Sequence, residues 1–331
     1  MIQERYIGIL QRLNSNHKSI NNLKTMAIPT TRTRENGTIT IDPELCTGCG
    51  KCITVCKSFN IVLTEGKATI GDPTRGFGCI GCGHCMAICP EGAIEIHGRE
   101  MSPADLYELP KGDTKAGYDQ LLSLLQHRRS IREYADREVE PEVIEKILEA
   151  AQTAPMGLPP SDINVLVIRG KEKSRAFAKD FSAYLKGMRF MTSGFFLAMM
   201  RPFWGKANDE MFRGFMRPLF SAYTDGMDEG ENYINYDAPL LMYFYGSPYT
   251  DPADPLIAAT YAMIAAESLG LGTCMLGAVH PFIQKGKKAE KFRKSHGIRY
   301  KSQEGLFVAF GYPAVRYRKG IRRTFASVTM V

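Results

Sequence analysis

The sequence predicts a chain of two folded domains, a small cysteine-rich domain followed by a larger one with helices and strands. The length of 331 residues is about two domains' worth. Eight of the nine cysteines fall between Cys46 and Cys89, and after Tyr118 apolar residues recur at helical spacing. A composition of 44% apolar and 23% charged residues is ordinary for packed globular protein and argues against disorder, collagen or coiled coil.

We expect no secretory signal in the first residues of the sequence. Residues 1–37 are basic, with little apolar periodicity, so we expect a loosely ordered extension. They lack the apolar core of a secretory signal, and no stretch of the chain approaches the roughly 18 to 20 apolar residues of a membrane helix. We therefore expect a cytoplasmic protein.

The cysteine spacing C-x2-C-x2-C-x3-C occurs twice. Two-residue spacings wrap a short loop around one iron–sulfur cubane, and the fourth cysteine reaches the neighbouring cluster. The spacing therefore predicts two [4Fe–4S] clusters with crossed ligation. The first cluster would be held by Cys46, Cys49, Cys52 and Cys89, and the second by Cys79, Cys82, Cys85 and Cys56.

Two other interpretations of these cysteines are weaker. Disulfide scaffolds are typical of small secreted chains, and zinc sites commonly use paired C-x-x-C knuckles. Residues 38–98 resemble the bacterial two-cluster [4Fe–4S] ferredoxins, although Lys57 replaces the proline that follows the fourth cysteine, whereas Pro90 keeps it. Alternating residues predict short strands at TITID and AIEIH and a hairpin at IVLTEGKATIG.

Residues 99–117 are rich in proline and glycine, which predicts a linker. We expect residues 118–331 to form the second domain. Helices are expected from Tyr118 and from Pro141, with HRRSIREY between them. In an extended chain Arg128, Ser130 and Arg132 lie on one side, where two guanidiniums and a hydroxyl suit a phosphate. A basic helix end that complements its own dipole explains this stretch equally well.

The succession TAPMGLPPSDINVLVI, YDAPLLMYFYG, AAESLGLGTCMLGAV and FVAFGYP resembles the nitroreductase family of FMN-dependent oxidoreductases over residues 118–331. The resemblance implies an α+β fold, an intimate homodimer and FMN at the subunit interface. It assigns the flavin phosphate and ribityl chain to Arg128, Arg129, Ser130 and Arg132, and the backbone near the flavin ring to Leu271, Gly272, Thr273 and Cys274. Arg323 matches the late arginine that reaches the phosphate, with Arg316 as the weaker candidate.

One region departs from the family pattern. The resemblance places Pro155, Met156 and Gly157 against the flavin, but Met156 replaces a serine and Pro159 lies near the asparagine position. Proline offers neither a side-chain donor nor an N–H, so we expect the ring to be held differently. No residue is assigned a catalytic role. Cys274 is interpreted as a small buried residue beside the flavin in preference to a nucleophile. His280 is interpreted as a structural histidine in preference to a residue that faces the flavin pocket.

Residues 188–227 form a compositional island that holds seven of the 16 Met, seven of the 17 Phe and the only Trp. Such residues suit a surface that adapts to apolar guests. We expect a substrate lid or wall, with dimer packing and a membrane-surface helix as successively weaker alternatives.

The predicted function is electron transfer from a low-potential donor protein through the clusters to FMN and on to a small organic acceptor. Nitroaromatics, quinones and activated alkenes are candidate acceptors, and use of NAD(P)H stays open. The alternative is a redox sensor or electron carrier without substrate turnover. We expect no nucleic-acid partner, because clusters and a flavin phosphate would neutralise most of the formal charge of +7.

Overall fold

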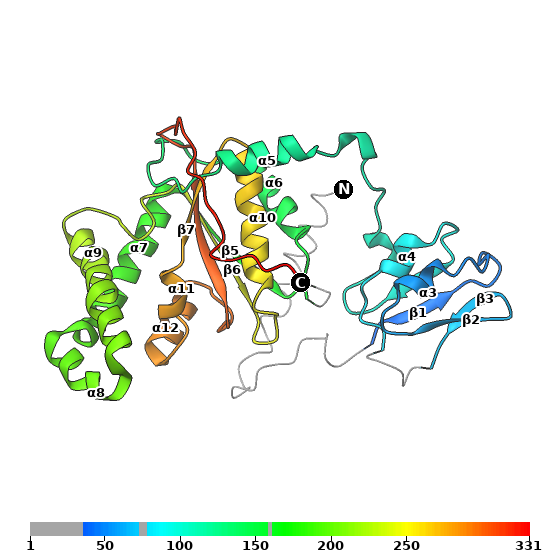
Figure 1. Ribbon diagram of the computed structural model, residues 1–331, viewed down its shortest axis with the longest axis horizontal. Helices are drawn as coiled ribbons and strands as arrows, with labels where there is room; N and C mark the ends of the chain where they lie inside the picture. Colours follow the sequence, from blue (N-terminus) through cyan, green and yellow to red (C-terminus); the bar gives the residue numbers. More distant parts are fainter. Residues whose placement is uncertain (1–35, 73–77, 158–160) are drawn as a thin grey trace.

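The computed structural model describes residues 36–72, 78–157 and 161–331 (Figure 1). The extension expected over residues 1–37 therefore lies almost wholly outside the described residues. In the part that is described, no helix is both long enough and apolar enough to cross a membrane.

The cysteine-rich unit contains two small antiparallel sheets. Strand β1 (Thr38–Ile41) pairs with β4 (Ile94–His97), and β2 (Ile61–Thr64) pairs with β3 (Lys67–Ile70) in the hairpin that the sequence predicts. Two short helices, α3 (Lys51–Val55) and α4 (His84–Ile88), follow the cysteine loops. Isoleucines of the strands share a small core with the cysteines, so metal binding would have to supply much of the stability of this unit.

An exposed segment joins the two units in Figure 1 and contains two single-turn 3-10 helices, η2 (Pro103–Asp105) and η3 (Gly112–Thr114). Helix α5 (Tyr118–His127) follows, and its apolar side chains Leu121 and Leu125 remain exposed.

The larger unit is built on a four-stranded antiparallel sheet. Its strands are β5 (Ile163–Arg169), β6 (Leu240–Gly246), β8 (Gly305–Gly311) and β7 (Gly272–Leu276), in that spatial order. Every residue of the central strands β6 and β8 is buried, because helices cover both faces of the sheet. The α+β class that the sequence predicts is confirmed.

The two faces of the sheet follow the alternation of side chains along a strand. Leu240, Met242 and Phe244 of β6 pack under α6 (Pro141–Gln152) and α10 (Asp254–Ser268). Alanines at the sheet-facing positions of α10 let that helix approach the sheet and α6 closely.

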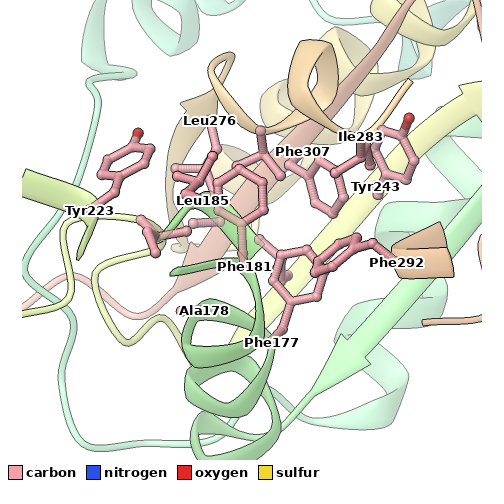
Figure 2. Close-up of a cluster of buried hydrophobic side chains, with 14 of the residues drawn as sticks. Phe177, Ala178, Phe181, Leu185, Tyr223, Tyr243, Leu276, Ile283, Phe292 and Phe307 are labelled. Carbon is pink, nitrogen blue, oxygen red and sulfur yellow. The ribbon is translucent and has the colours of Figure 1, made fainter. Parts of the chain in front are cut away.

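The opposite face carries an aromatic core, drawn in Figure 2, in which Tyr243 stacks on Phe307 with ring centroids 3.9 Å apart. Phe177 and Phe181 of α7 (Lys171–Lys186) contribute to it. Burying each such side chain stabilises the fold by about 1.5–3 kcal/mol. Helices α9 (Arg217–Asp228), α11 (Val279–Phe282) and α12 (Lys287–Ser295) complete this layer.

The Met- and Phe-rich island forms a helical lobe beyond α7 (Figure 1). It comprises η4 (Arg189–Thr192), α8 (Gly194–Met211), the π-helical turn η5 (Phe212–Met216) and α9. Non-helical backbone at Gly205 kinks α8, and Trp204 stacks on Phe212 with centroids 4.6 Å apart. Phe195 and Phe203 are 82% and 80% exposed, so much of the apolar surface of this lobe faces outward.

Candidate cluster cavities and flavin site

The two cysteine sets fold as copies of one loop, each cysteine lying 33 positions from its counterpart, as Cys46 does from Cys79. In both copies a left-handed glycine, Gly50 or Gly83 at φ 72°, precedes a five-residue helix. The fourth cysteine ends each helix in extended backbone. Gly48 has φ 70°, and a Cβ there would lie 1.9 Å from the Gly66 carbonyl oxygen, so only glycine fits.

The helices carry the fourth cysteines across to the other loop. Two cavities result, each lined by four thiols. The first cysteine cavity contains Cys46, Cys49, Cys52 and Cys89. The second cysteine cavity, of about 580 Å³, contains Cys56, Cys79, Cys82 and Cys85.

These are the sets that the spacing predicts for two crossed clusters. Among the described residues no three metal-binding side chains converge tightly enough for a single ion, whereas four thiols spread around a cavity suit a cubane. The donor set therefore fits [4Fe–4S] clusters.

Burial and backbone donors act in opposite directions on these thiols. Burial raises the pKa of Cys85 to about 12 and raises the pKa of Cys52 and of Cys79. The backbone N–H of Ala68, 3.4 Å from the Cys46 sulfur, is the main cause of the lowered pKa of that thiol. Buried thiols of this kind ligate as thiolates only because a bound cation deprotonates them.

The arginine segment leaves α5 as extended chain and runs beside β7. Ser130 forms a parallel bridge with Thr273, and the Ile131 N–H donates to the Thr273 carbonyl at 2.9 Å. The Ile131 side chain is buried against Gly272, where an added Cβ would lie 2.4 Å from Ile131 Cγ1. Ile131 therefore anchors the segment, and the alternate positions Ser130 and Arg132 are directed elsewhere.

Arg132 is the most clearly defined cation of this segment. Its guanidinium lies 5.6 Å from the centre of the Tyr236 ring, and the adjacent Cys274 is the main cause of its raised pKa. Burial is the main cause of the raised pKa of the Cys274 thiol, and Arg132 opposes it. The guanidinium of Arg132 carries a fixed positive charge and planar donor groups, which suit a phosphate.

Arg129 is oriented differently from its neighbours. Its guanidinium donates to the Arg128 carbonyl at 2.7 Å and lies against Gly320 of the C-terminal tail. The tail thus runs beside the arginine segment, while Arg316 and Arg323 are exposed within it.

Other predicted flavin residues lie in two separate places. Leu271, Thr273 and Cys274 are buried in and beside β7, and the Thr273 hydroxyl finds no hydrogen-bond partner within the described ranges. Pro155, Met156 and Gly157 instead line the second cysteine cavity. Pro159 lies outside the described residues.

The loop at residues 154–157 is fixed to the larger unit. The Gly157 N–H donates to Asp254 at the start of α10, at 2.9 Å. Ala154 and Met156 also line an apolar pocket of about 200 Å³ beside β5 and β6. One short segment therefore separates the second cysteine cavity from the interior of the larger unit.

Two histidines singled out by the sequence differ in their surroundings. His280 is buried, bonding to the Tyr243 hydroxyl at 2.9 Å and lying 3.3 Å from the Gln303 carbonyl, as a structural histidine should. His84 lines the second cysteine cavity, where four thiols would already supply the ligands.

Tyr236, which has φ 57° and lies beside Arg132, could not be identified from the sequence, because no periodicity in the sequence relates the two residues.

Residues 125–312 match the profile of the nitroreductase family. The chain belongs to the nitroreductase family. Residues 45–94 match the 4Fe-4S dicluster domain. The protein is thus a nitroreductase-family oxidoreductase that carries an iron–sulfur domain before its family domain.

Individual relatives are more distant. A Methanothermobacter thermautotrophicus protein, named as a candidate NADH dehydrogenase/NAD(P)H nitroreductase, is 40% identical over 60 residues, which cover 18% of this chain and 31% of that protein. The nitroreductase with bound FMN from Bacteroides fragilis is 20% identical, with a TM-score of 0.48 over 64% of this chain and 98% of its own. The one from Desulfitobacterium hafniense is 23% identical, with a TM-score of 0.46 over 64% and 97%.

Proposed function

We propose that this nitroreductase-family protein takes single electrons from a low-potential donor protein into two [4Fe–4S] clusters and passes them to FMN, which reduces a small organic acceptor by two electrons. The acceptor class comprises nitroaromatics, quinones and activated alkenes. Clusters exchange one electron at a time, whereas a flavin collects two. A fused cluster domain is therefore useful to a flavoprotein whose donor is a one-electron carrier.

The observation that carries this proposal is the composition of the second cysteine cavity. It is lined by four thiols of the cysteine-rich unit and, on its other side, by residues 154–157 of the family domain. The residues that line the first cysteine cavity all belong to the cysteine-rich unit. This contact supports one order for the proposed route, in which the cluster of the first cavity is the outer one and the cluster of the second cavity delivers electrons to the family domain.

The arginine segment would hold the flavin phosphate. Arg128 and Arg132 supply positive charge and planar donor groups, and Ser130 supplies a hydroxyl from the same side of an extended chain fixed on β7. The loop at Pro155–Gly157 lies at the second cysteine cavity instead. In a homodimer, one flavin site would combine the arginine segment of one subunit with the Pro155–Gly157 loop of its partner.

Exposed apolar residues support the homodimer. Leu121 and Leu125 of α5 are 45% and 42% exposed, and Ile321 and Phe325 of the tail are 73% and 85% exposed. Large apolar side chains gathered on one helix and one tail are typical of surfaces that a second subunit covers. The exposed phenylalanines of the α8 lobe would provide the wall for apolar acceptors.

The experiment compares two reductants on two cysteine variants. Cys56→Ala should damage the cluster of the second cavity and Cys89→Ala that of the first, because each fourth ligand crosses over. Both variants should reduce FMN far more slowly with a one-electron protein donor, and at an unchanged rate with dithionite. Iron and sulfide contents report the loss of the damaged cluster, and retained FMN serves as the control for folding.

The rate pattern separates the proposal from its alternatives. If the rates of FMN reduction by the protein donor and by dithionite fall equally while FMN stays bound, or if neither rate falls, the clusters do not pass electrons to the flavin. If electrons reach FMN but no acceptor is turned over, the protein is an electron carrier or redox sensor.

A further inference from the structure

A buried side-chain amide faces the second cysteine cavity. Asn60 lines this cavity together with Cys56, Cys79, Cys82 and Cys85. The residue is 5% exposed, and its Nδ2 group has no hydrogen-bond partner among the described residues. A buried amide donor without an acceptor is costly, so such a group calls for an explanation.

The internal repeat supplies a reference for this position. The shift of 33 positions that relates the two cysteine sets places Asn60 on Ala93. Ala93 is 3% exposed, lines the first cysteine cavity, and donates its backbone N–H to the Cys89 sulfur at 3.3 Å. The fold therefore accepts a methyl group at this place in one copy and carries an amide in the other.

The backbone around the two positions is the same in both copies. Phe59 and Gly92, the preceding residues, have φ angles of 57° and 64°. Each donates its N–H at 3.4 Å to the carbonyl of the fourth cysteine of its set. The carbonyls of Asn60 and Ala93 each accept a backbone bond of 2.8 Å, from Gly71 and Asp42 respectively. Anchoring on both sides leaves only the side chain different.

We propose that Asn60 donates a hydrogen bond from Nδ2 to a sulfur of the cluster in the second cysteine cavity and thereby raises the reduction potential of that cluster relative to the one in the first. The inference rests on the proposed assignment of clusters to the two cavities. The only hydrogen-bond acceptors that a cubane and its thiolates offer to an N–H are sulfurs, and these sulfurs become more negative when the cluster is reduced. A donor at this position therefore stabilises the reduced state.

The consequence is a direction for electron flow. A higher potential in the second cavity draws electrons from the outer cluster toward residues 154–157. Asn60 would thus tune the potential of the cluster adjacent to the family domain, a role that requires no contact with the organic acceptor.

The test is voltammetry of the anaerobically purified full chain with both clusters loaded. Asn60→Ala restores the residue that the other copy carries, so folding and iron content should be retained. In Asn60→Ala, the ratio of reduced to oxidised cluster in the second cysteine cavity, measured at a fixed potential, should fall by about three- to tenfold. A tenfold fall corresponds to about 59 mV for a one-electron couple. Asn60→Asp should shift the same cluster further in the same direction, because a carboxylate replaces the donor.

Ala93→Asn is the matched reciprocal variant. Ala93→Asn should raise the reduction potential of the cluster in the first cysteine cavity and leave the potential of the cluster in the second cavity unchanged. The proposal is overturned if neither cluster moves in Asn60→Ala and Asn60→Asp with iron intact, or if both clusters move together.

Resonance Raman spectra of the unsubstituted chain provide a measurement that needs no variant to fold. Iron–sulfur stretching bands should shift on transfer to D2O, and the Asn60 variants should lose part of that shift. If the iron–sulfur bands of Asn60→Asp shift in D2O as far as those of the unsubstituted chain, the proposal is also overturned. None of these readouts involves FMN. A chain whose clusters fail to reduce the flavin would therefore refute the proposed function while leaving the Asn60 result intact.

Discussion

Replacing Gly272 by alanine should disturb the flavin site through the packing beneath it. The added Cβ would lie 2.4 Å from Ile131 Cγ1 and 2.7 Å from Ile131 Cβ. Normal carbon contacts are about 3.5–4.0 Å, so Ile131 would have to move by roughly 1 Å. Ile131 is β-branched and 6% exposed, which leaves it little freedom to rotate away. Overpacking of this kind costs about 1–3 kcal/mol.

The displacement would reach the neighbouring residues of the same extended segment, Ser130 and Arg132. We therefore expect Gly272→Ala to lower the free energy of unfolding by about 1–3 kcal/mol and to weaken FMN retention by about two- to twelvefold if half of that energy comes from the site. Urea unfolding followed by circular dichroism and fluorescence of released FMN measure the two effects.

Gly277→Ala is the matched control. Gly277 follows β7, and a Cβ there would have no neighbour within 4 Å. It should unfold and bind FMN as the unsubstituted chain does, and iron content should be unchanged in both variants. If Gly272→Ala behaves like Gly277→Ala, the anchoring role assigned to Ile131 is wrong.

Three further predictions concern the phosphate site, a buried histidine and the α8 lobe. Arg128→Ala combined with Arg132→Ala should release FMN and leave the iron content unchanged. Arg129→Ala should retain more FMN than this double variant, because the Arg129 guanidinium lies against Gly320. Full retention of FMN in the double variant would show that the phosphate site is assigned wrongly. Burial lowers the pKa of His296 below its ordinary 6.5, with Asp180 opposing. The unfolded state therefore takes up the proton first, and unfolding free energy should fall as pH drops through about 6.5, less so in His296→Gln; equal pH slopes would contradict this. Phe195→Ser with Phe203→Ser should change stability by no more than about 0.5 kcal/mol and raise KM for apolar acceptors; dimer dissociation in light scattering would assign these residues to subunit packing.

The features that the sequence predicted correctly are those encoded locally. The hairpin of β2 and β3 follows from alternation around Glu65 and Gly66, whose φ angles of 50° and 78° make the turn. The start of α6 at Pro141 follows from helical spacing and from the fixed φ of proline. The grouping of the cysteines also follows from short spacings, since two-residue gaps confine three thiols to one loop.

The features that could not be predicted depend on contacts between distant segments. Alternation identifies β1 and β4 as strands but does not say that they pair with each other. The resemblance could not say that Pro155–Gly157 line a cysteine cavity of the other unit, and the placement of this segment against the flavin stays a prediction. Likewise, the approach of Tyr236 to Arg132 depends on how the segment before β6 crosses the end of the sheet.

The differences between the two cysteine loops are better explained by their surroundings than by ligation. Both copies keep the four cysteines and the left-handed glycines at 50 and 83. After the fourth cysteine they diverge, and the sequence PEGA at 90–93 corresponds to KSFN at 57–60. Even the left-handed position is retained, although Phe59 adopts it less readily than Gly92.

Three of those four divergent residues, Lys57, Ser58 and Asn60, line the second cysteine cavity, which residues 154–157 close from the side of the family domain. From the corresponding loop of the other copy, Glu91 and Ala93 line the first cavity, whose described lining residues all belong to the cysteine-rich unit. The cysteine loops themselves differ at positions such as Lys51 and His84, but both keep their cysteines. On the proposed route, the divergence after the fourth cysteine would change charge and hydrogen bonding at the junction where electrons pass between the units, without altering the ligands of either cluster.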